Sequence, residues 1–360
     1  MRGNAKCEMI KLKDIAQELS LDVSVVSRAL NPGRTPHPIR EETRKLVLAT
    51  AKRLGYHPNR QASFLKKGSG ATILCFVPDV GHRVVADLVY GISEAAGEAN
   101  FPVNFFFGKK EEDFFDFFKK IHSVPHAAVI SYAPQLQIPE QGSHDFLPTL
   151  PDEYKKVILD YSEKHSSFLL LNLESNLNLC EDDEIQKINR IEIDEQAGGR
   201  RVAEHFLECG CERFFCVSGR QRYPLREKGF RDATTQYGIK CETLTCPLLA
   251  KLAKNGVKTG IFAESDFLAY DLIGLCKEME ITLGDKILLV GYDDIFASAW
   301  LNPSLTTIHQ PTRQEGHLAV KKVIDSLTTS SQPSIERIEP KLIVRETTGG
   351  KRINDHLLNI

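Results

Sequence analysis

The strongest constraint on the fold is a regular alternation of short apolar segments with longer amphipathic ones, which starts at Gly70. A first cycle reads TILCFVP, DLVYGISEAAGEA, PVNFFF, EDFFDFFKKI and AAVIS, and a second cycle begins with RIEI at Arg190. Short apolar runs are typical of buried strands in parallel sheets, and the longer segments are typical of the helices that cover such sheets. The alternation therefore predicts an α/β core of two successive Rossmann-like halves, in which ligands bind beyond the carboxyl ends of the strands.

Composition narrows the class of protein. The 360 residues are 42% hydrophobic and 26% charged, which are ordinary values for a folded globular chain. No apolar run approaches 18 residues and the first twenty residues contain no leader-like apolar stretch, so we expect a cytoplasmic protein without a membrane span. The nine cysteines include no CxxC pair, which favours reduced thiols over a zinc site. We expect no metal and no cofactor.

Charge is distributed unevenly along the chain. Residues 1–70 contain 14 Lys and Arg against 6 Asp and Glu, whereas the remainder is acidic and the formal net charge is −2. A small basic head followed by a larger acidic body is the charge pattern of a protein that neutralises phosphates with one end. A solvated charged face would give the same excess, so the charge alone does not decide between the two.

Residues 12–31 have the pattern of two short helices joined by a tight turn. Apolar side chains recur at helical spacing in LKDIAQEL, a polar break follows at Ser20, and Asp22 is placed to cap a second helix, VSVVSRAL. Ala16 is small where the two helices must cross. The spacing describes a helix-turn-helix, and a third helix from about Arg40 to Leu54 completes a three-helix core.

The second helix of such a motif lies in the major groove of DNA, with its first residues against the base edges. At this end Val23 can read shape or a thymine methyl group, and Ser24 can donate or accept a hydrogen bond. One turn later Arg28 can reach a guanine edge or a phosphate. Ser27 is placed for a phosphate contact.

Two segments, DIAQELSLDVSVVSRALN and EETRKLVLATAKRLGYHPNRQASFLKKG, resemble the DNA-binding heads of the LacI/GalR-type bacterial transcription regulators. The resemblance implies a helix-turn-helix domain over 9–58, and a hinge helix and linker over 59–70 that orders on operator DNA. It also implies a homodimer on a palindromic operator, because one head reads half a site. The residues that it places on DNA are Asp22, Val23, Ser24, Ser27, Arg28, Asn31, Arg60, Ala62 and Leu65. Among these, Leu65 would be the apolar wedge in the minor groove, and Ala62 would pack against the dimer mate.

The body resembles the core of the same family, which is similar to periplasmic sugar-binding proteins of type I. PDVGHRVVADLVYGI, VGYDDI, NPSLTTIHQP and LIVRET carry this resemblance. It implies a two-lobed effector-binding and dimerisation core over 71–350, with the chain crossing between lobes near Leu173, Trp300 and Ser330. Lobe 1 would cover about 71–172 and 302–329, and lobe 2 about 173–300 and 331–350. The residues that it places on a small-molecule effector are Asn172, Arg226, Ser265 and Asp293.

The effector itself is left open by departures from the family pattern. Val84 and Val85 stand where many sugar-responsive members have an aromatic pair, and the segment between Cys241 and Gly260 is short. Ser265 stands where asparagine is usual. A sugar or sugar derivative, a non-sugar effector, a partner protein, or no effector at all are the alternatives.

The sequence bears on three classes of function. A DNA-binding regulator, most simply a repressor whose effector changes the angle between the lobes, accounts for the basic head. A cytoplasmic solute-binding or sensor protein without operator specificity is the alternative. An enzyme is disfavoured because the sequence contains no P-loop, HExxH or GxSxG motif. The aromatic run FFDFF at 114–118 has helical spacing, which predicts core and dimer surface and not a ligand box.

Overall fold

A computed structural model describes residues 10–30, 39–56, 70–79, 83–134, 149–174, 183–219, 223–329 and 332–351. The chain divides into two compact units, Met1–Lys67 and Gly68–Ile360. Asn31, Arg60, Ala62 and Leu65, together with the predicted hinge helix, lie outside the described residues.

In the described part of the first unit, three helices form a bundle: α1 (Leu12–Leu19), α2 (Val23–Leu30) and α3 (Glu41–Leu54). Its core consists of small and branched side chains: Ile15, Ala16, Val26, Ala29, Val47 and Ala51. After α1 the chain turns at Ser20, which has a left-handed backbone (φ 52°), and the N–H of Leu21 donates to the carbonyl of Ala16. The predicted three-helix head with a tight turn is confirmed.

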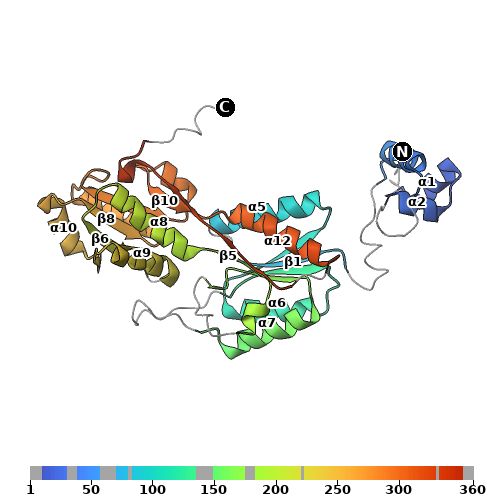
Figure 1. Cartoon of the computed structure of the whole chain (residues 1–360), viewed down its shortest axis with the longest axis horizontal. Helices are drawn as coiled ribbons and strands as arrows, with labels where there is room; N and C mark the ends of the chain where they lie inside the picture. The colour runs from blue at the N-terminus through green and yellow to red at the C-terminus, as the bar shows by residue number, and fades with distance from the viewer. Residues whose placement is uncertain are drawn as a thin grey trace, which may run out of the picture. The chain divides into compact units, whose positions relative to one another are not determined.

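The second unit contains two six-stranded sheets, each forming one lobe. All strands of the first sheet are parallel, in the order β11-β5-β4-β3-β1-β2. These strands are β1 (Ile73–Pro78), β2 (Val103–Gly108), β3 (Ala128–Tyr132), β4 (Phe168–Leu171), β5 (Arg190–Ile193) and β11 (Ile335–Ile338). In Figure 1, α5 (Arg83–Glu98) and α12 (Thr312–Ser326) cover one face of this sheet, and α6 (Glu111–Ile121) and α7 (Asp152–Lys164) cover the other.

The second sheet has the order β12-β10-β9-β8-β6-β7, with only β12 antiparallel among its pairings. Its strands are β6 (Arg213–Val217), β7 (Cys241–Thr243), β8 (Thr259–Ala263), β9 (Ile287–Tyr292), β10 (Thr306–His309) and β12 (Lys341–Ile343). Side chains of α8 (Glu195–Glu208) and α9 (Pro224–Gln236) pack into one apolar cluster of the lobe. Those of α10 (Cys246–Asn255) and α11 (Asp266–Glu278) pack into another. Short 3-10 helices occur at Ile185–Lys187, Phe296–Ala299 and Glu346–Thr348. The predicted α/β core of two Rossmann-like lobes is confirmed.

The predicted crossing points between the lobes are wrong by ten to twenty residues. Strand β5 pairs with β4 and β11 in the first sheet, so the chain leaves lobe 1 after Ile193 and not near Leu173. Strand β10 still belongs to the second sheet, so the return lies between His309 and Thr312 and not near Trp300. The third crossing lies between Ile338 and Lys341 and not near Ser330, because β11 and β12 belong to different sheets. An apolar strand sequence is the same in either lobe, and only its hydrogen-bonded register assigns it to a sheet.

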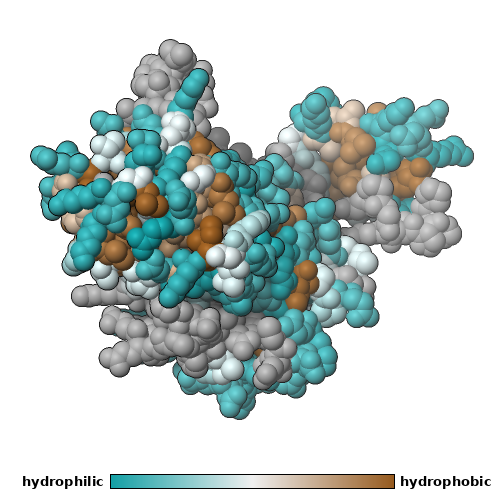
Figure 2. Space-filling model, turned by 60° about the vertical axis from the view of Figure 1, so that its left-hand side comes forward, coloured by the Kyte–Doolittle hydropathy of each residue, from teal (hydrophilic) through white to brown (hydrophobic). Residues whose placement is uncertain are grey.

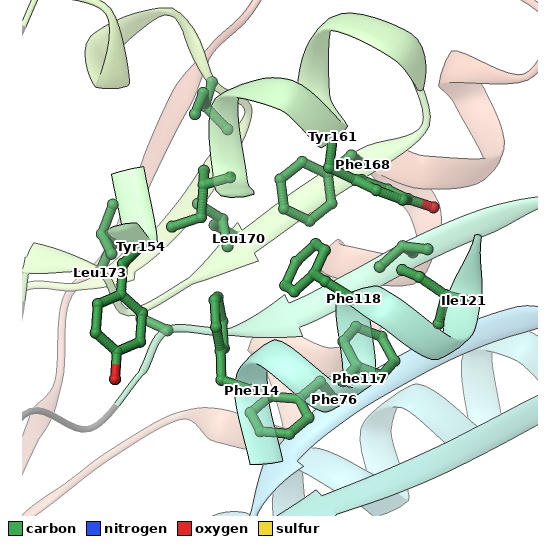
Figure 3. Close-up of a cluster of buried hydrophobic side chains, with 14 of the residues drawn as sticks. Phe76, Phe114, Phe117, Phe118, Ile121, Tyr154, Tyr161, Phe168, Leu170 and Leu173 are labelled. Carbon is green, nitrogen blue, oxygen red and sulfur yellow. The ribbon is translucent and has the colours of Figure 1, made fainter. Parts of the chain in front are cut away.

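The largest aromatic core lies in lobe 1, below the sheet. Phe114, Phe117 and Phe118 of α6 are almost fully buried and contact Phe76 of β1 and the tyrosines of α7. Figure 3 shows these rings pointing toward one another between the helices and the strands. Core packing therefore explains the FFDFF run. Across the described residues, no helix has the length and hydropathy needed to cross a membrane.

Candidate functional site

The beginning of α2 is the exposed end of the helix-turn-helix. Asp22 Oδ1 accepts a hydrogen bond from the N–H of Ser24 (2.7 Å), and the Asp22 carbonyl accepts from the N–H groups of Val25 and Val26. Hydrogen bonds from the hydroxyl and N–H of Ser24 hold the pKa of Asp22 below its usual value. The carboxylate thus caps the helix, as the sequence predicted.

The candidate DNA-reading side chains of α2 differ in exposure. Val23 is 44% exposed and Ser24 is exposed, whereas Ser27 and Arg28 are half-buried. Arg28 Nε donates to the carbonyl of Ser24 (3.3 Å), so the guanidinium lies back along its own helix. Val26 and Ala29 point into the core. The first turn of α2 therefore presents one apolar and one hydroxyl side chain to the outside, followed by a basic one.

In the second unit, Arg226 of α9 is buried and holds four hydrogen bonds. It forms a bidentate pair with Glu195, with Nε to Oε2 at 2.5 Å and Nη2 to Oε1 at 3.1 Å. Nη1 donates to the carbonyl of Glu264 (2.8 Å) and to Asp293 Oδ1 (3.0 Å). The rings of Tyr223 and Tyr292 lie 3.9 and 3.8 Å from the guanidinium carbon. Burial alone would lower the pKa of Arg226, but Glu195 and Asp293 raise it well above its usual value. These five residues, Arg226, Glu195, Asp293, Tyr223 and Tyr292, are called the arginine cluster below.

Asp293 follows strand β9 with an unusual backbone (φ 112°). Its Oδ1 also accepts from Gln310 Nε2 (2.7 Å), which follows β10 at the same edge of the sheet. Two of the predicted effector residues, Arg226 and Asp293, are therefore in direct contact, beyond the carboxyl ends of parallel strands.

The other two predicted effector residues are used within the protein. Asn172, after β4 of lobe 1, donates through Nδ2 to Glu315 Oε1 (2.7 Å) and accepts from the N–H of Ile193 (2.9 Å). Ser265 caps α11 by accepting from the N–H of Leu268 (3.4 Å).

A second set of buried polar side chains, in lobe 1, interacts electrostatically with the arginine cluster. It consists of Glu315, Asn172, Tyr132 and Glu192. Burial, together with the charges of Glu315 and Glu195, raises the pKa of Tyr132. Burial is the largest cause of the raised pKa of Glu315, and Glu192 and Glu195 contribute to it. Glu315 is fully buried, and its Oε2 has no hydrogen-bond partner among the described residues.

Within the described ranges, one buried set of side chains could hold a metal ion. Sγ of Cys216 and carboxylate oxygens of Glu227 and Glu264 lie within 4.8 Å of one another. The carboxylates already have protein donors, since Arg231 pairs with Glu227 (2.6 Å) and Ser218 donates to Glu264 (2.7 Å). Hydrogen bonds within the protein account for this set without an ion.

Sequence reasoning missed Glu195, Tyr292, Gln310 and Glu315. Glu195 follows the strand that ends at Ile193, Tyr292 ends a strand, and Gln310 follows the strand that ends at His309. Glu315 lies in the first turn of α12. Position relative to a strand end was therefore the one usable signal for the first three. That signal marks many residues. Which of these residues come into contact depends on how the crossings between the lobes bring distant strand ends together.

Similarity to known proteins extends over most of the chain. Residues 203–348 match the periplasmic binding protein-like domain. The HTH-type transcriptional repressor PurR of Photobacterium profundum is 23% identical and aligns over 94% of this chain and 98% of its own length. The HTH-type transcriptional regulator DegA of Bacillus subtilis is 24% identical over 93% of this chain and 97% of its own length.

The solved structures with a similar fold include a repressor and a transcriptional regulator. The Lac repressor dimer bound to operator and the anti-inducer ONPF aligns with a TM-score of 0.63 at 20% identity, covering 95% of this chain and 99% of that one. The transcriptional regulator CelR in complex with cellobiose aligns with a TM-score of 0.59 at 19% identity, covering 94% and 99%. These alignments span both the helical head and the two-lobed core.

Proposed function

Because the chain belongs to the LacI/GalR-type family of bacterial transcriptional regulators, we propose that it is a repressor that binds a palindromic operator as a homodimer. We further propose that a small molecule bound between the lobes sets its operator affinity. The observation that carries the proposal is the exposed, capped first turn of α2 in a head with an excess of basic residues. A protein with this activity acts on chromosomal DNA, so we place it in the cytoplasm.

The proposed contacts follow from the chemistry of α2. Val23 would contact a thymine methyl group, Ser24 a base edge, and Arg28 a guanine or a phosphate once it leaves its contact with the Ser24 carbonyl. Ser27, Asn31 and Arg60 would position the head on the backbone. Leu65 would insert into the minor groove, with Ala62 against its dimer mate.

An exposed aromatic patch on lobe 2 supports the homodimer. Phe267, Phe296 and Trp300 are 53%, 66% and 46% exposed. Phe296 and Trp300 pack against each other, and Phe267 packs against Tyr270, whose hydroxyl meets Ser298 of the Phe296–Ala299 helix. Figure 2 shows apolar side chains gathered among hydrophilic ones on the forward face of this lobe. Exposed aromatic side chains that adjoin one another are typical of protein interfaces.

The relatives suggest what kind of effector to test. One aligned regulator is complexed with cellobiose and another structure with D-xylulofuranose. In this chain Arg226, Asp293, Asn172 and Ser265 are proposed to lie at the effector site. Val84 and Val85, which stand where many sugar-responsive family members have an aromatic pair, lie in the first turn of α5.

The test is a titration of the full-length protein against DNA from upstream of its own gene and against a scrambled duplex, over a salt series. We expect tight, sequence-selective binding, with log affinity falling by about 0.9 per neutralised phosphate for each decade of salt. Arg28→Gln should weaken operator binding, while Lys254→Gln, on α10 of lobe 2, should not. Equal weak binding to both duplexes would favour a solute-binding sensor.

A further inference from the structure

We infer that Glu195 is a specificity-determining residue of the effector site: it occupies the anion-binding side of Arg226, so that the site takes a positively charged, amine-bearing ligand and rejects an anionic one. This inference rests on the proposed function, because it assigns a ligand class to the effector site of a regulator.

Arg226 has almost no hydrogen-bonding capacity left for a ligand. A guanidinium has five N–H donors, and four of them are used by Glu195, Asp293 and the Glu264 carbonyl. The bidentate pair with Glu195 is the arrangement that an anionic ligand's carboxylate or phosphate would itself adopt. Tyr223 and Tyr292 cover the flat faces of the guanidinium. An anionic ligand would have to displace a buried carboxylate of the chain itself.

Buried carboxyl groups are in excess around Arg226. Glu195 and Asp293 share Arg226, and Glu315 and Glu192 approach from lobe 1. Arg190 lies 3.6 Å from Glu192 and also pairs with Glu174. Among the described residues, no Lys, Arg or His lies within 4.0 Å of the Glu315 carboxylate. The carboxylates of Glu195 and Asp293 outnumber the one guanidinium that they share, so an added anion would meet excess negative charge in a poorly screened interior. Glu192, whose pKa burial raises to about 8, adds no charge at pH 7.

A buried carboxyl oxygen of Glu315, in lobe 1, has no hydrogen-bond partner among the described residues. Glu315 Oε1 accepts from Asn172, but Oε2 is buried without a partner among the described residues, and so is the hydroxyl oxygen of Thr312 one turn earlier. Buried polar atoms of native proteins are nearly always hydrogen-bonded, to protein or to something bound. An ammonium group supplies three donors and a positive charge, which would favour the ionised form of Glu315 that burial disfavours. Asn172 bonds both to Glu315 and to the N–H of Ile193, two residues before Glu195, so a group held by Glu315 and Glu195 would lie where the chain crosses from lobe 1 to lobe 2.

The experiment uses three probes that share one sugar ring and differ in charge: glucosamine, glucose and glucuronate. Each is titrated calorimetrically into the full-length protein at pH 7 and constant ionic strength. We expect the wild type to bind glucosamine at least about tenfold more tightly than glucuronate. Equal or tighter binding of glucuronate, or no binding of glucosamine at millimolar concentration, would overturn the inference.

Two variants separate the roles of the carboxylates. Glu195→Gln frees the charge of Arg226, so the affinity for glucuronate should rise about tenfold and the preference for the amine should shrink. Glu315→Gln should weaken glucosamine binding about tenfold without any gain for glucuronate. If Glu195→Gln leaves the affinity for glucuronate unchanged, Glu195 is not the residue that excludes anions. Circular dichroism and operator binding check that each variant is folded.

Glu242→Gln is the matched control, because Glu242 pairs with Arg213 (2.6 Å) in the same lobe but outside the arginine cluster. Its probe preference should equal that of the wild type. Operator binding is measured on the same preparations. A wild type that binds operator but prefers glucuronate contradicts this inference alone, whereas a wild type that binds no operator contradicts the proposed function whichever hexose it binds.

Discussion

Ser20 is a residue whose backbone conformation costs stability. It ends α1 with φ 52°, in the left-handed region where a Cβ is unfavourable and glycine is preferred. We predict that Ser20→Gly stabilises the head by about 0.5–1 kcal/mol. Native-state hydrogen exchange of the α1 and α2 amides in the full chain measures this. Ser27→Gly, inside α2, is the control and should lower protection by a similar amount; lower protection in Ser20→Gly would contradict the prediction.

Glu192 is a residue that links stability to pH. Burial raises its pKa to about 8, against a usual value near 4.5, although Arg190 acts in the opposite direction. The folded chain therefore keeps a proton that the unfolded chain loses, so the free energy of unfolding should fall between pH 4.5 and 8, by at most about 1.4 kcal/mol per pH unit from this group. Urea unfolding at pH 5.5, 6.5 and 7.5 measures the slope.

The control for that slope is Glu192→Gln, which cannot ionise. Its slope should be shallower than that of the wild type but not zero, because burial also raises the pKa of Glu264 to about 8 and of Asp266 to about 7. An unchanged slope in Glu192→Gln would show that Glu192 is ionised in the folded chain.

Pairs of helices in this fold approach each other through glycine. A Cβ on Gly199 of α8 would lie 2.0 Å from the carbonyl oxygen of Arg226 on α9, and one on Gly229 would lie 2.1 Å from that of Gln196. We predict that Gly199→Ala destabilises the core by about 1–3 kcal/mol and separates Glu195 from Arg226, since the two helices carry that ion pair. Thermal unfolding and a crystal structure of the variant check the two parts.

Gly274→Ala is the helix control. Gly274 is exposed in α11 and a Cβ there would meet nothing within 4 Å, so alanine should stabilise by about 0.5–1 kcal/mol through helix propensity alone. Equal effects of the two substitutions would mean that α8 and α9 can move apart freely.

Secondary structure was largely predictable from the sequence, but its assignment to lobes was not. The segment RIEI was correctly read as a strand and wrongly placed at the beginning of the second lobe, because its sheet is decided by hydrogen bonds to β4 and to β11, and β11 lies more than a hundred positions away. The same limit applies to the candidate site. Arg226 and Asp293 could be named from the sequence, whereas Glu195 looks like any acidic residue in the first turn of a helix until α8 and α9 are packed together.

At the scale of the whole molecule, the aromatic patch of Phe267, Phe296 and Trp300 should decide whether two copies associate. We predict that the double variant Phe296→Glu with Trp300→Glu is monomeric at micromolar concentration, because charge in the centre of an apolar interface is costly to bury. Its operator affinity should fall at least about tenfold, since a monomer contacts half of a palindrome. Sedimentation velocity and operator titration measure the two effects on the same sample.

The matched control for the patch is Tyr237→Glu, which places the same charge at an aromatic residue of similar exposure at the end of α9. It should leave both the sedimentation coefficient and the operator affinity unchanged. A double variant that remains dimeric would exclude this patch as the interface. A double variant that is monomeric but keeps full operator affinity would show instead that the heads bind DNA without the core dimer, which would remove the route by which a ligand between the lobes controls repression.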